Sequence, residues 1–260
     1  EGRAEEGDEE EANEEANEEG NEEGNEEGNE ENRENEERDD AAERQRVEGA
    51  GIVTAAIGWN SWYDLWDKIV ADDIEANSAL LAEILKGWPE VEGRNLRVVV
   101  DDGWQIAWGE WEANEKFPDG MEALAGAILA DGFTPGIWFA PMLVEESNAL
   151  VEAQPSWFVQ GAQWVHPVHG AMRILDLSQP DAESHLRGVV KRIVAWGYTL
   201  LKIDFLFSAT FEGERASPMT GMAHYKLALK VIREAAGEEV EILAVGAPPV
   251  PTLQYVDSWR

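Results

Sequence analysis

From residue 47 onward, short apolar runs alternate with segments whose apolar residues recur at helical spacing. The strand-like runs cover residues 52–57, 96–100, 135–139, 199–203, 241–245 and 253–256. The helical segments cover residues 79–85, 121–129, 182–195 and 222–236. Continuously apolar strands separated by helices predict a parallel sheet that is covered on both faces.

This alternation predicts an α/β fold, namely an incomplete (β/α)8 TIM barrel with about six of its eight βα units. A complete barrel has eight strands and typically ~250 residues, more than residues 47–260 supply. An open doubly wound sheet is the alternative. It is not favoured, because no glycine-rich phosphate-binding turn follows the first strand.

Residues 1–46 have a different composition and predict a disordered acidic tail. Half of them are Asp or Glu, and none is Val, Ile, Leu, Met or aromatic. Residues 13–28 read NEEA-NEEG-NEEG-NEEG, a low-complexity repeat. Such a segment cannot bury enough apolar surface to offset the entropy of ordering. An acidic interaction tail is the functional alternative.

The formal charge of −34 and the absence of cysteine exclude several classes of function. A strongly acidic chain binds the nucleic-acid backbone poorly, so no nucleic-acid partner is expected. The sequence contains no run of about 18 apolar residues, so no membrane-spanning helix is predicted. Without Cys there are no disulfides, thiolate nucleophiles or Cys-ligated zinc. The acidic start shows no signal peptide, which favours a cytoplasmic location. Oligomeric state is left open.

Polar and aromatic residues gather where the predicted strands end. They are Trp59, Asp101, Asp102, Trp138, Lys202, Asp204 and Asp257. The carboxyl ends of barrel strands share one face, where active sites form. A single Asp there is readily explained as a helix N-cap. The pair Asp101-Asp102 and the sequence Lys202-Ile203-Asp204 favour a site instead.

Lys202 and Asp204 are two residues apart on a strand and therefore point to the same side. The lysine is expected to lower the pKa of Asp204 and keep it ionised. A carboxylate that attacks an anomeric carbon is the nucleophile of a retaining glycosidase. A plain buried ion pair is the alternative. The twelve Trp residues suit sugar binding, although a heavily aromatic core would also explain them.

Several of these segments resemble, in order, landmarks of bacterial α-galactosidases of the melibiase group, glycoside hydrolase family 36, allied to family 27. They are GWNSW at 58–62, VDDGW at 100–104, GIWFAP at 136–141, ILDLS at 174–178, LKIDF at 201–205 and VDSWR at 256–260. The resemblance implies a TIM barrel that removes terminal α-D-galactose from melibiose- or raffinose-type sugars, with no metal and no cofactor.

The resemblance also implies roles for individual residues. Asp204 would be the nucleophile that forms a covalent galactosyl-enzyme, and Lys202 would bind sugar hydroxyls. Asp101 and Asp102 would bind the O4 and O6 side of the sugar. The remaining implied binding residues are the wall residues Trp59 and Trp138, and Arg260 on the O2/O3 side.

The sequence departs from the family pattern at two positions, which affect the expected activity and the expected substrate. The acid/base carboxyl is expected just beyond Arg260, and Asp257 matches a non-catalytic position, so the chain as given is expected to be nearly inactive. Val245 stands where relatives often have Cys near O2, which leaves an N-acetylgalactosaminide substrate open. Transfer of galactose to another sugar and an inactive sugar-binding barrel are further alternatives.

Two other clusters are candidate sites. His166 and His169 form His-x-x-His around Pro167, in a loop or hairpin. The proline breaks the helical spacing that a metal pair would need, so a surface loop is favoured over a metal site. Glu145 and Glu146 follow the third strand. Helix capping is preferred there over an acidic pair at the rim of the site.

Overall fold

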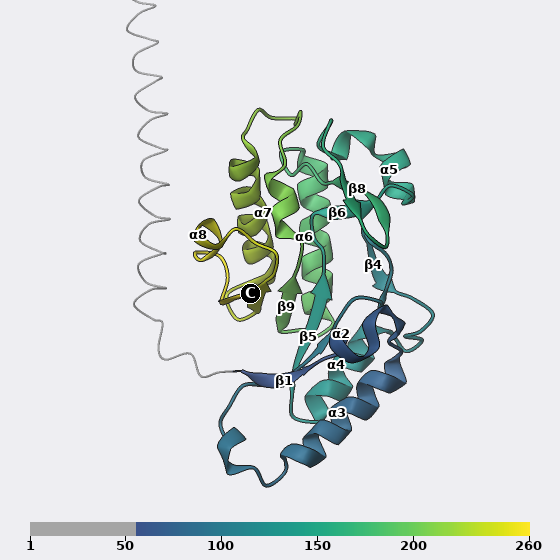
Figure 1. Cartoon of the computed structure of the whole chain (residues 1–260), viewed down its shortest axis with the longest axis vertical. Helices are drawn as coiled ribbons and strands as arrows, with labels where there is room; N and C mark the ends of the chain where they lie inside the picture. The colour runs from purple at the N-terminus through teal and green to yellow at the C-terminus, as the bar shows by residue number, and fades with distance from the viewer. Residues whose placement is uncertain (1–55) are drawn as a thin grey trace, which may run out of the picture. The chain divides into compact units, whose positions relative to one another are not determined.

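Six parallel strands form the central sheet of the protein in a computed structural model that describes residues 56–260 (Figure 1). They are β1 (Ile57–Asn60), β2 (Leu96–Val100), β5 (Thr134–Phe139), β9 (Leu200–Ile203), β10 (Glu241–Ala244) and β11 (Ser258–Trp259). The predicted tail, residues 1–46, and the start of the first predicted strand lie outside the described residues.

The strands lie side by side in chain order, and each neighbouring pair is parallel. A doubly wound sheet reverses its strand order partway across. This sheet instead adds every strand on the same side and curls as a barrel wall does. The predicted partial TIM barrel is therefore confirmed, and the doubly wound alternative is wrong.

Helices follow the strands where the apolar spacing predicted them. The longer ones are α3 (Ala71–Leu85), α4 (Gly120–Ala130), α6 (Pro180–Ala195) and α7 (Gly221–Ala236). Thr220 caps α7 by accepting a hydrogen bond from Ala223 N, and Gly237 ends it with a φ of 84°. Among residues 56–260, no helix has the length and apolar character needed to cross a membrane.

Shorter helical segments complete the connections. They are α2 (Trp62–Leu65), α5 (Ala149–Ala153), α8 (Pro249–Thr252), and the 3₁₀ turns η1 (Trp66–Lys68), η2 (Pro89–Val91), η3 (Pro155–Trp157) and η4 (Leu206–Thr210).

The strand predicted at residues 253–256 is wrong. Pro249 begins helix α8, and Tyr255 N then donates to Thr252 O to close a turn. Pairing with β10 begins only at Asp257, whose N donates to Ile242 O. Apolar residues at 253 and 256 suggested a strand, but proline favours the first turn of a helix because it needs no N–H there.

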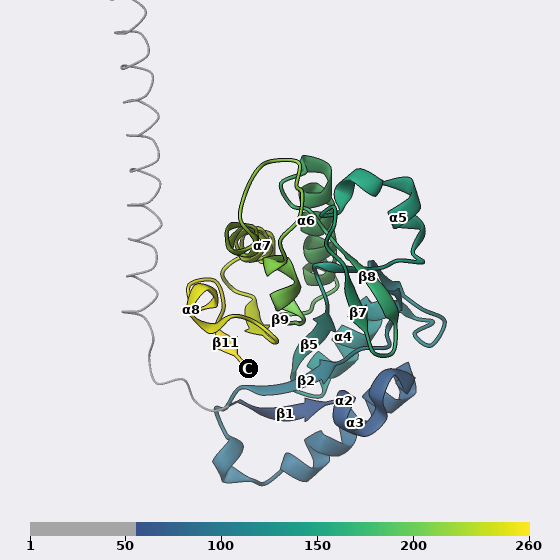
Figure 2. The ribbon, with the colours of Figure 1, turned by 45° about the horizontal axis from the view of Figure 1, so that its top comes forward.

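Two antiparallel additions stand beyond the carboxyl ends of the central strands. After β2, a hairpin pairs β3 (Gln105–Ala107) with β4 (Glu110–Ala113). After β5, a three-stranded sheet has the order β6 (Leu143–Glu145), β8 (Gly170–Ile174), β7 (Trp164–His166). Figure 2 shows β7 and β8 side by side, so His166 and His169 lie in a hairpin around Pro167 rather than in the surface loop that the sequence favoured.

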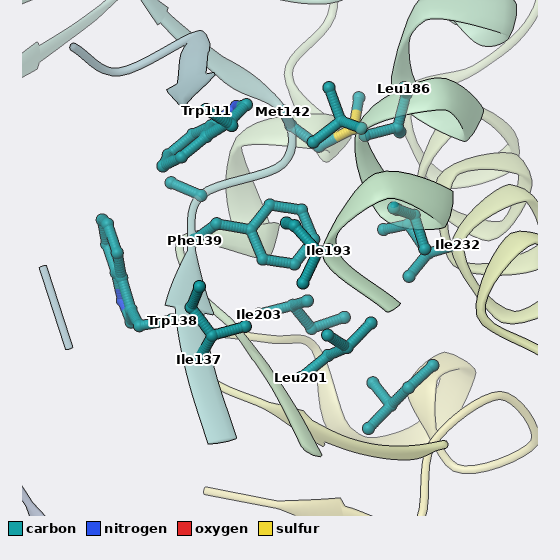
Figure 3. Packing of buried hydrophobic residues seen from close by; sticks show 14 of the residues in the cluster. Trp111, Ile137, Trp138, Phe139, Met142, Leu186, Ile193, Leu201, Ile203 and Ile232 are labelled. Carbon is teal, nitrogen blue, oxygen red and sulfur yellow. The ribbon is translucent and has the colours of Figure 1, made fainter. Parts of the chain in front are cut away.

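The two central strands, β5 and β9, are buried along nearly their whole length. Figure 3 shows Phe139 turned toward α6, where Ile193 and Leu186 lie, while Trp138 points away on the opposite side of β5. Alternation along a strand thus separates two tasks. Phe139 packs the barrel wall against its helices, whereas Trp138 faces inward with its register partner Lys202.

Candidate active site

A cavity of about 470 Å³ opens at the carboxyl ends of β2, β5 and β9. Charged residues from the ends of β2 and β9 line it, namely Asp101, Asp102, Lys202 and Asp204. Aromatic residues surround them: Trp62, Tyr63, Trp66, Trp108, Trp138 and Phe205. Five of the seven residues predicted from strand ends therefore meet in one place, and Arg260 reaches the same cavity.

Both carboxylate oxygens of Asp101 and its backbone N–H form hydrogen bonds. Its Oδ2 accepts from Lys202 Nζ at 2.5 Å and from Asn60 Nδ2 at 2.7 Å. Its Oδ1 accepts from Asp102 N, and its own N–H donates to Ser61 Oγ. The side chains of Lys202 and Asp101 are only 5% and 3% exposed. A buried charge of either sign is costly alone, so each requires the other.

Lys202 lowers the pKa of Asp204, as predicted, but this effect does not determine the net shift. The ammonium group bonds to Asp101 rather than to Asp204. Burial raises the pKa of Asp204 above its ordinary value. Hydrogen bonds from Trp138 and Phe205 and the charge of Lys202 oppose that rise without overcoming it. Lys202 and Asp204 share one face of a strand, so their side chains are near each other. The Lys202 ammonium nevertheless donates its hydrogen bond to Asp101, which is 101 residues away in the sequence.

Asp204 is nevertheless fixed in position. Trp138 Nε1 donates to its Oδ2 at 3.1 Å, and Phe205 N donates to its Oδ1 at 2.7 Å. Phe205 adopts a left-handed conformation with φ 55°, an unfavourable one for an aromatic residue. Strained backbone of this kind gathers at functional sites. Here it occurs at the residue whose N–H donates to the Asp204 carboxylate.

One carboxylate oxygen of Asp102 accepts a hydrogen bond from Gln105, and the other faces His169. Gln105 Nε2 donates to Oδ1 at 2.6 Å, and Oδ2 lies 3.8 Å from His169 Nε2. The next residue, Gly103, has φ 113°, and a Cβ there would lie 2.5 Å from the carbonyl oxygen of Asp67. Glycine is therefore required for the turn that presents Asp102.

The aromatic wall differs in part from the prediction. Trp138 lines the cavity as expected. Trp59 lies on β1, half-buried against the core, and is not among the residues that line the cavity. Trp62 and Trp66, a few residues further on, line it instead, with ring centroids 5.1 Å apart.

Arg260 and Asp257 lie at opposite ends of the short strand β11. The Arg260 guanidinium bonds to the Tyr63 hydroxyl and stacks on the Tyr63 ring at the cavity. Asp257 does not lie at a carboxyl end, contrary to the prediction. It precedes β11 and accepts from Arg233 Nη2 at 2.5 Å and from Ile242 N at 2.8 Å. These contacts make it a structural residue.

Sequence reasoning missed the contribution of the β7–β8 hairpin to the site. His166 and His169 both line the cavity, with ring centroids 4.9 Å apart. The prediction that Glu145 caps a helix is wrong. Asn148 caps α5, and Glu145 Oε1 lies 3.3 Å from His169 Nδ1. In the described part of the chain, no cluster of three or more potential ligands could hold a metal ion.

A family model described as Melibiase matches residues 76–230, more than half of the sequence. The chain belongs to the melibiase family. The resemblance inferred from the strand-exit motifs is thereby confirmed.

Individual relatives of this melibiase-family chain are α-galactosidases. The structure of an α-galactosidase from Thermus thermophilus in complex with p-nitrophenyl α-D-galactopyranoside is 33% identical, with a TM-score of 0.65. That match covers 78% of this chain and 40% of the other. The α-galactosidase of Escherichia coli is 25% identical over 154 residues, which cover 53% of this chain and 21% of the relative.

A third relative, the α-galactosidase AgaA of Geobacillus stearothermophilus, has the same fold, with a TM-score of 0.62 at 20% identity. The match covers 78% of this chain and 30% of AgaA. The melibiase-family chain thus spans less than half the length of these relatives.

Proposed function

We propose that the cavity binds a terminal α-D-galactose and that the barrel hydrolyses α-galactosides with retention, using Asp204 as the nucleophile. Membership of the melibiase family supports the reaction class. Relatives whose structures hold p-nitrophenyl α-D-galactopyranoside, stachyose or raffinose support the substrate class.

The observation that carries the proposal is the fixed carboxylate of Asp204 at the exit of β9. Two N–H donors, from Trp138 and Phe205, hold one oxygen each, so the group cannot rotate freely. A preoriented nucleophile avoids the entropic cost of alignment. In the reaction, an Asp204 oxygen bonds to the anomeric carbon while the bond to the leaving oxygen breaks. Water later cleaves the resulting galactosyl ester.

The surrounding groups suit a neutral sugar. Asp102, Lys202 and Arg260 supply hydrogen-bonding groups in the same cavity as Asp204. Trp138, Trp108 and Phe205 present aromatic surface on which the apolar face of a sugar ring packs. The predicted role of Trp59 is better filled by Trp62 and Trp66.

A retaining mechanism needs a second carboxyl ~5–5.5 Å from the nucleophile as acid and base. Asp101 is unsuited, because Lys202 and Asn60 both donate hydrogen bonds to its Oδ2. Asp257 is unsuited, because Arg233 binds it away from the cavity. We assign this role to the aspartate that the family pattern places shortly after the arginine matched by Arg260.

The direct test is hydrolysis of an aryl α-galactoside by the natural full-length protein. Asp204→Ala is expected to lower kcat on the order of 10⁴-fold or more, because the covalent route is lost. Asp257→Asn serves as the matched carboxylate control and is expected to retain turnover if it folds. Undiminished turnover by Asp204→Ala would refute the assignment.

A second candidate substrate is a terminal α-N-acetylgalactosaminide. Val245 lines the cavity, and its side chain offers apolar contact rather than a hydrogen bond. A relative named A type blood α-D-galactosamine galactosaminidase from Flavonifractor plautii is 34% identical over 70 residues. Comparing kcat/KM for aryl galactoside and aryl N-acetylgalactosaminide decides between the two sugars.

A further inference from the structure

The tip of the β7–β8 hairpin brings a histidine between two carboxylates from other elements. His169 Nδ1 lies 3.3 Å from Glu145 Oε1 on β6, and His169 Nε2 lies 3.8 Å from Asp102 Oδ2 beyond β2. Its ring also packs on Trp108, with centroids 5.0 Å apart. The His169 side chain is 23% exposed and lines the cavity.

The hydrogen bonds of the neighbouring His166 show which of the two imidazoles can carry a second proton. His166 Nδ1 accepts from both Val168 N and His169 N, each at 3.1 Å. A ring nitrogen that accepts hydrogen bonds carries no proton, so His166 is the neutral partner. Burial, followed by repulsion from His169, lowers the pKa of His166. Of the two rings, His169 is therefore the one that can carry a positive charge.

The groups around His169 favour its charged form. Interaction with Asp102 is the largest cause that raises the pKa of His169, and burial opposes it. The charges of Glu145 and of Asp67, on η1, raise it further. His166, the fourth titratable group of the cluster, is neutral for the reason given above.

The free oxygen of Asp102 is the one that this imidazolium faces. Oδ1 is occupied by Gln105, whereas Oδ2 has the 3.8 Å contact, which is longer than a hydrogen bond. An ionised carboxylate oxygen accepts more than one hydrogen bond, so Oδ2 keeps capacity for a ligand hydroxyl.

We propose that His169 is a positioning residue for the sugar: its imidazolium, anchored by Glu145, holds Asp102 with Oδ2 directed to a substrate hydroxyl, and sugar binding weakens when that charge is lost. This inference rests on the proposed function, since it takes the cavity to be the galactose site. It adds a pH-dependent element, contributed by the hairpin, to a site built from barrel strands.

The sign of the pH dependence follows from the raised pKa. Below that pKa the imidazolium is present and Asp102 is held. As the pH rises through it, His169 becomes neutral and the attraction disappears. Affinity for galactose should therefore fall on the alkaline side. Glu145→Gln removes one of the charges that raise the pKa, so the fall should begin at a lower pH.

The experiment measures two quantities on the natural full-length protein and its variants. Histidine-selective NMR resolves the titration of His166, His169, His185 and His224, and calorimetry gives galactose affinity from pH 5 to 9. We expect a signal titrating above its ordinary value that disappears in His169→Gln and moves to lower pH in Glu145→Gln. Galactose should bind His169→Gln roughly tenfold more weakly at pH 6, with little dependence on pH.

A control variant and the pattern of results distinguish failure of the positioning role from failure of the proposed function. His185→Gln alters a histidine that packs on Trp157 and does not line the cavity, so its affinity profile should match the parent's. Equal, pH-independent affinity in the parent and in His169→Gln would overturn the positioning role while leaving the proposed function intact. An identical alkaline limb in Glu145→Gln would also overturn it. No galactose binding by the parent would overturn both proposals.

Discussion

At the scale of single residues, the site depends on which buried charges find partners. Motif spacing placed Asp101, Asp102, Lys202 and Asp204 at strand exits, and these four do meet in one cavity. The partners of these charges were not predictable, because the Lys202–Asp101 bond joins residues far apart in the sequence. Strand spacing fixes the direction of a side chain but not the charge that it meets.

The buried pair predicts a large effect on stability. Lys202→Met should reduce the free energy of unfolding by about 3–5 kcal/mol, because it leaves Asp101 buried without its cation. Adding Asp101→Leu should restore much of that loss. Chemical denaturation measures both. Lys86→Met, which breaks an exposed pair with Glu83, is the control and should cost less than about 1 kcal/mol. Equal effects at the two lysines would contradict this account.

Asp204 predicts the acidic limb of activity. A nucleophile must be ionised, so kcat/KM should fall as the pH drops through the raised pKa of Asp204. Trp138→Phe removes an N–H donor that lowers this pKa, so the limb should move to higher pH. Trp88→Phe, an exposed tryptophan outside the cavity, should leave the pH profile of the parent protein unchanged. An unmoved limb in Trp138→Phe would exclude the donor role.

At the scale of elements, strands and helices of the barrel followed from apolar spacing, whereas the additions did not. Strands β6 and β7 have three residues each, too few to show a period. Their antiparallel pairing with β8 brings His169 back to Glu145. A His-x-x-His sequence around a proline contained the hairpin but gave no sign that it folds over the site.

The turn after β2 supplies a test at this scale. Gly103→Ala should lower the free energy of unfolding by about 1–3 kcal/mol, because it combines an unfavourable φ with a clash against Asp67 O. Gly126→Ala, on the exposed side of α4 with nothing near its Cβ position, should instead stabilise by about 0.5–1 kcal/mol. Thermal unfolding distinguishes the two. Effects of the same sign would show that local strain does not govern this turn.

At the scale of the whole molecule, one face of a partial barrel gathers the functional groups. The number of strands and their chain order followed from the sequence, because buried parallel strands are continuously apolar and the helices between them are long. The last strand was misplaced by a few residues, since α8 begins with proline where the apolar pattern suggested extended chain. Because the strand begins after Asp257, this residue lies outside the predicted site and pairs with Arg233.

The central claim is that Asp204 forms a covalent bond to the sugar, and a trapping measurement tests it most directly. The natural full-length protein is incubated with an activated 2-deoxy-2-fluoro-α-galactoside, digested, and examined by mass spectrometry. The account predicts one glycosylated peptide, with the sugar on Asp204 and no adduct in Asp204→Ala. An adduct on another carboxylate, or turnover of an aryl α-galactoside without an adduct on Asp204, would contradict it.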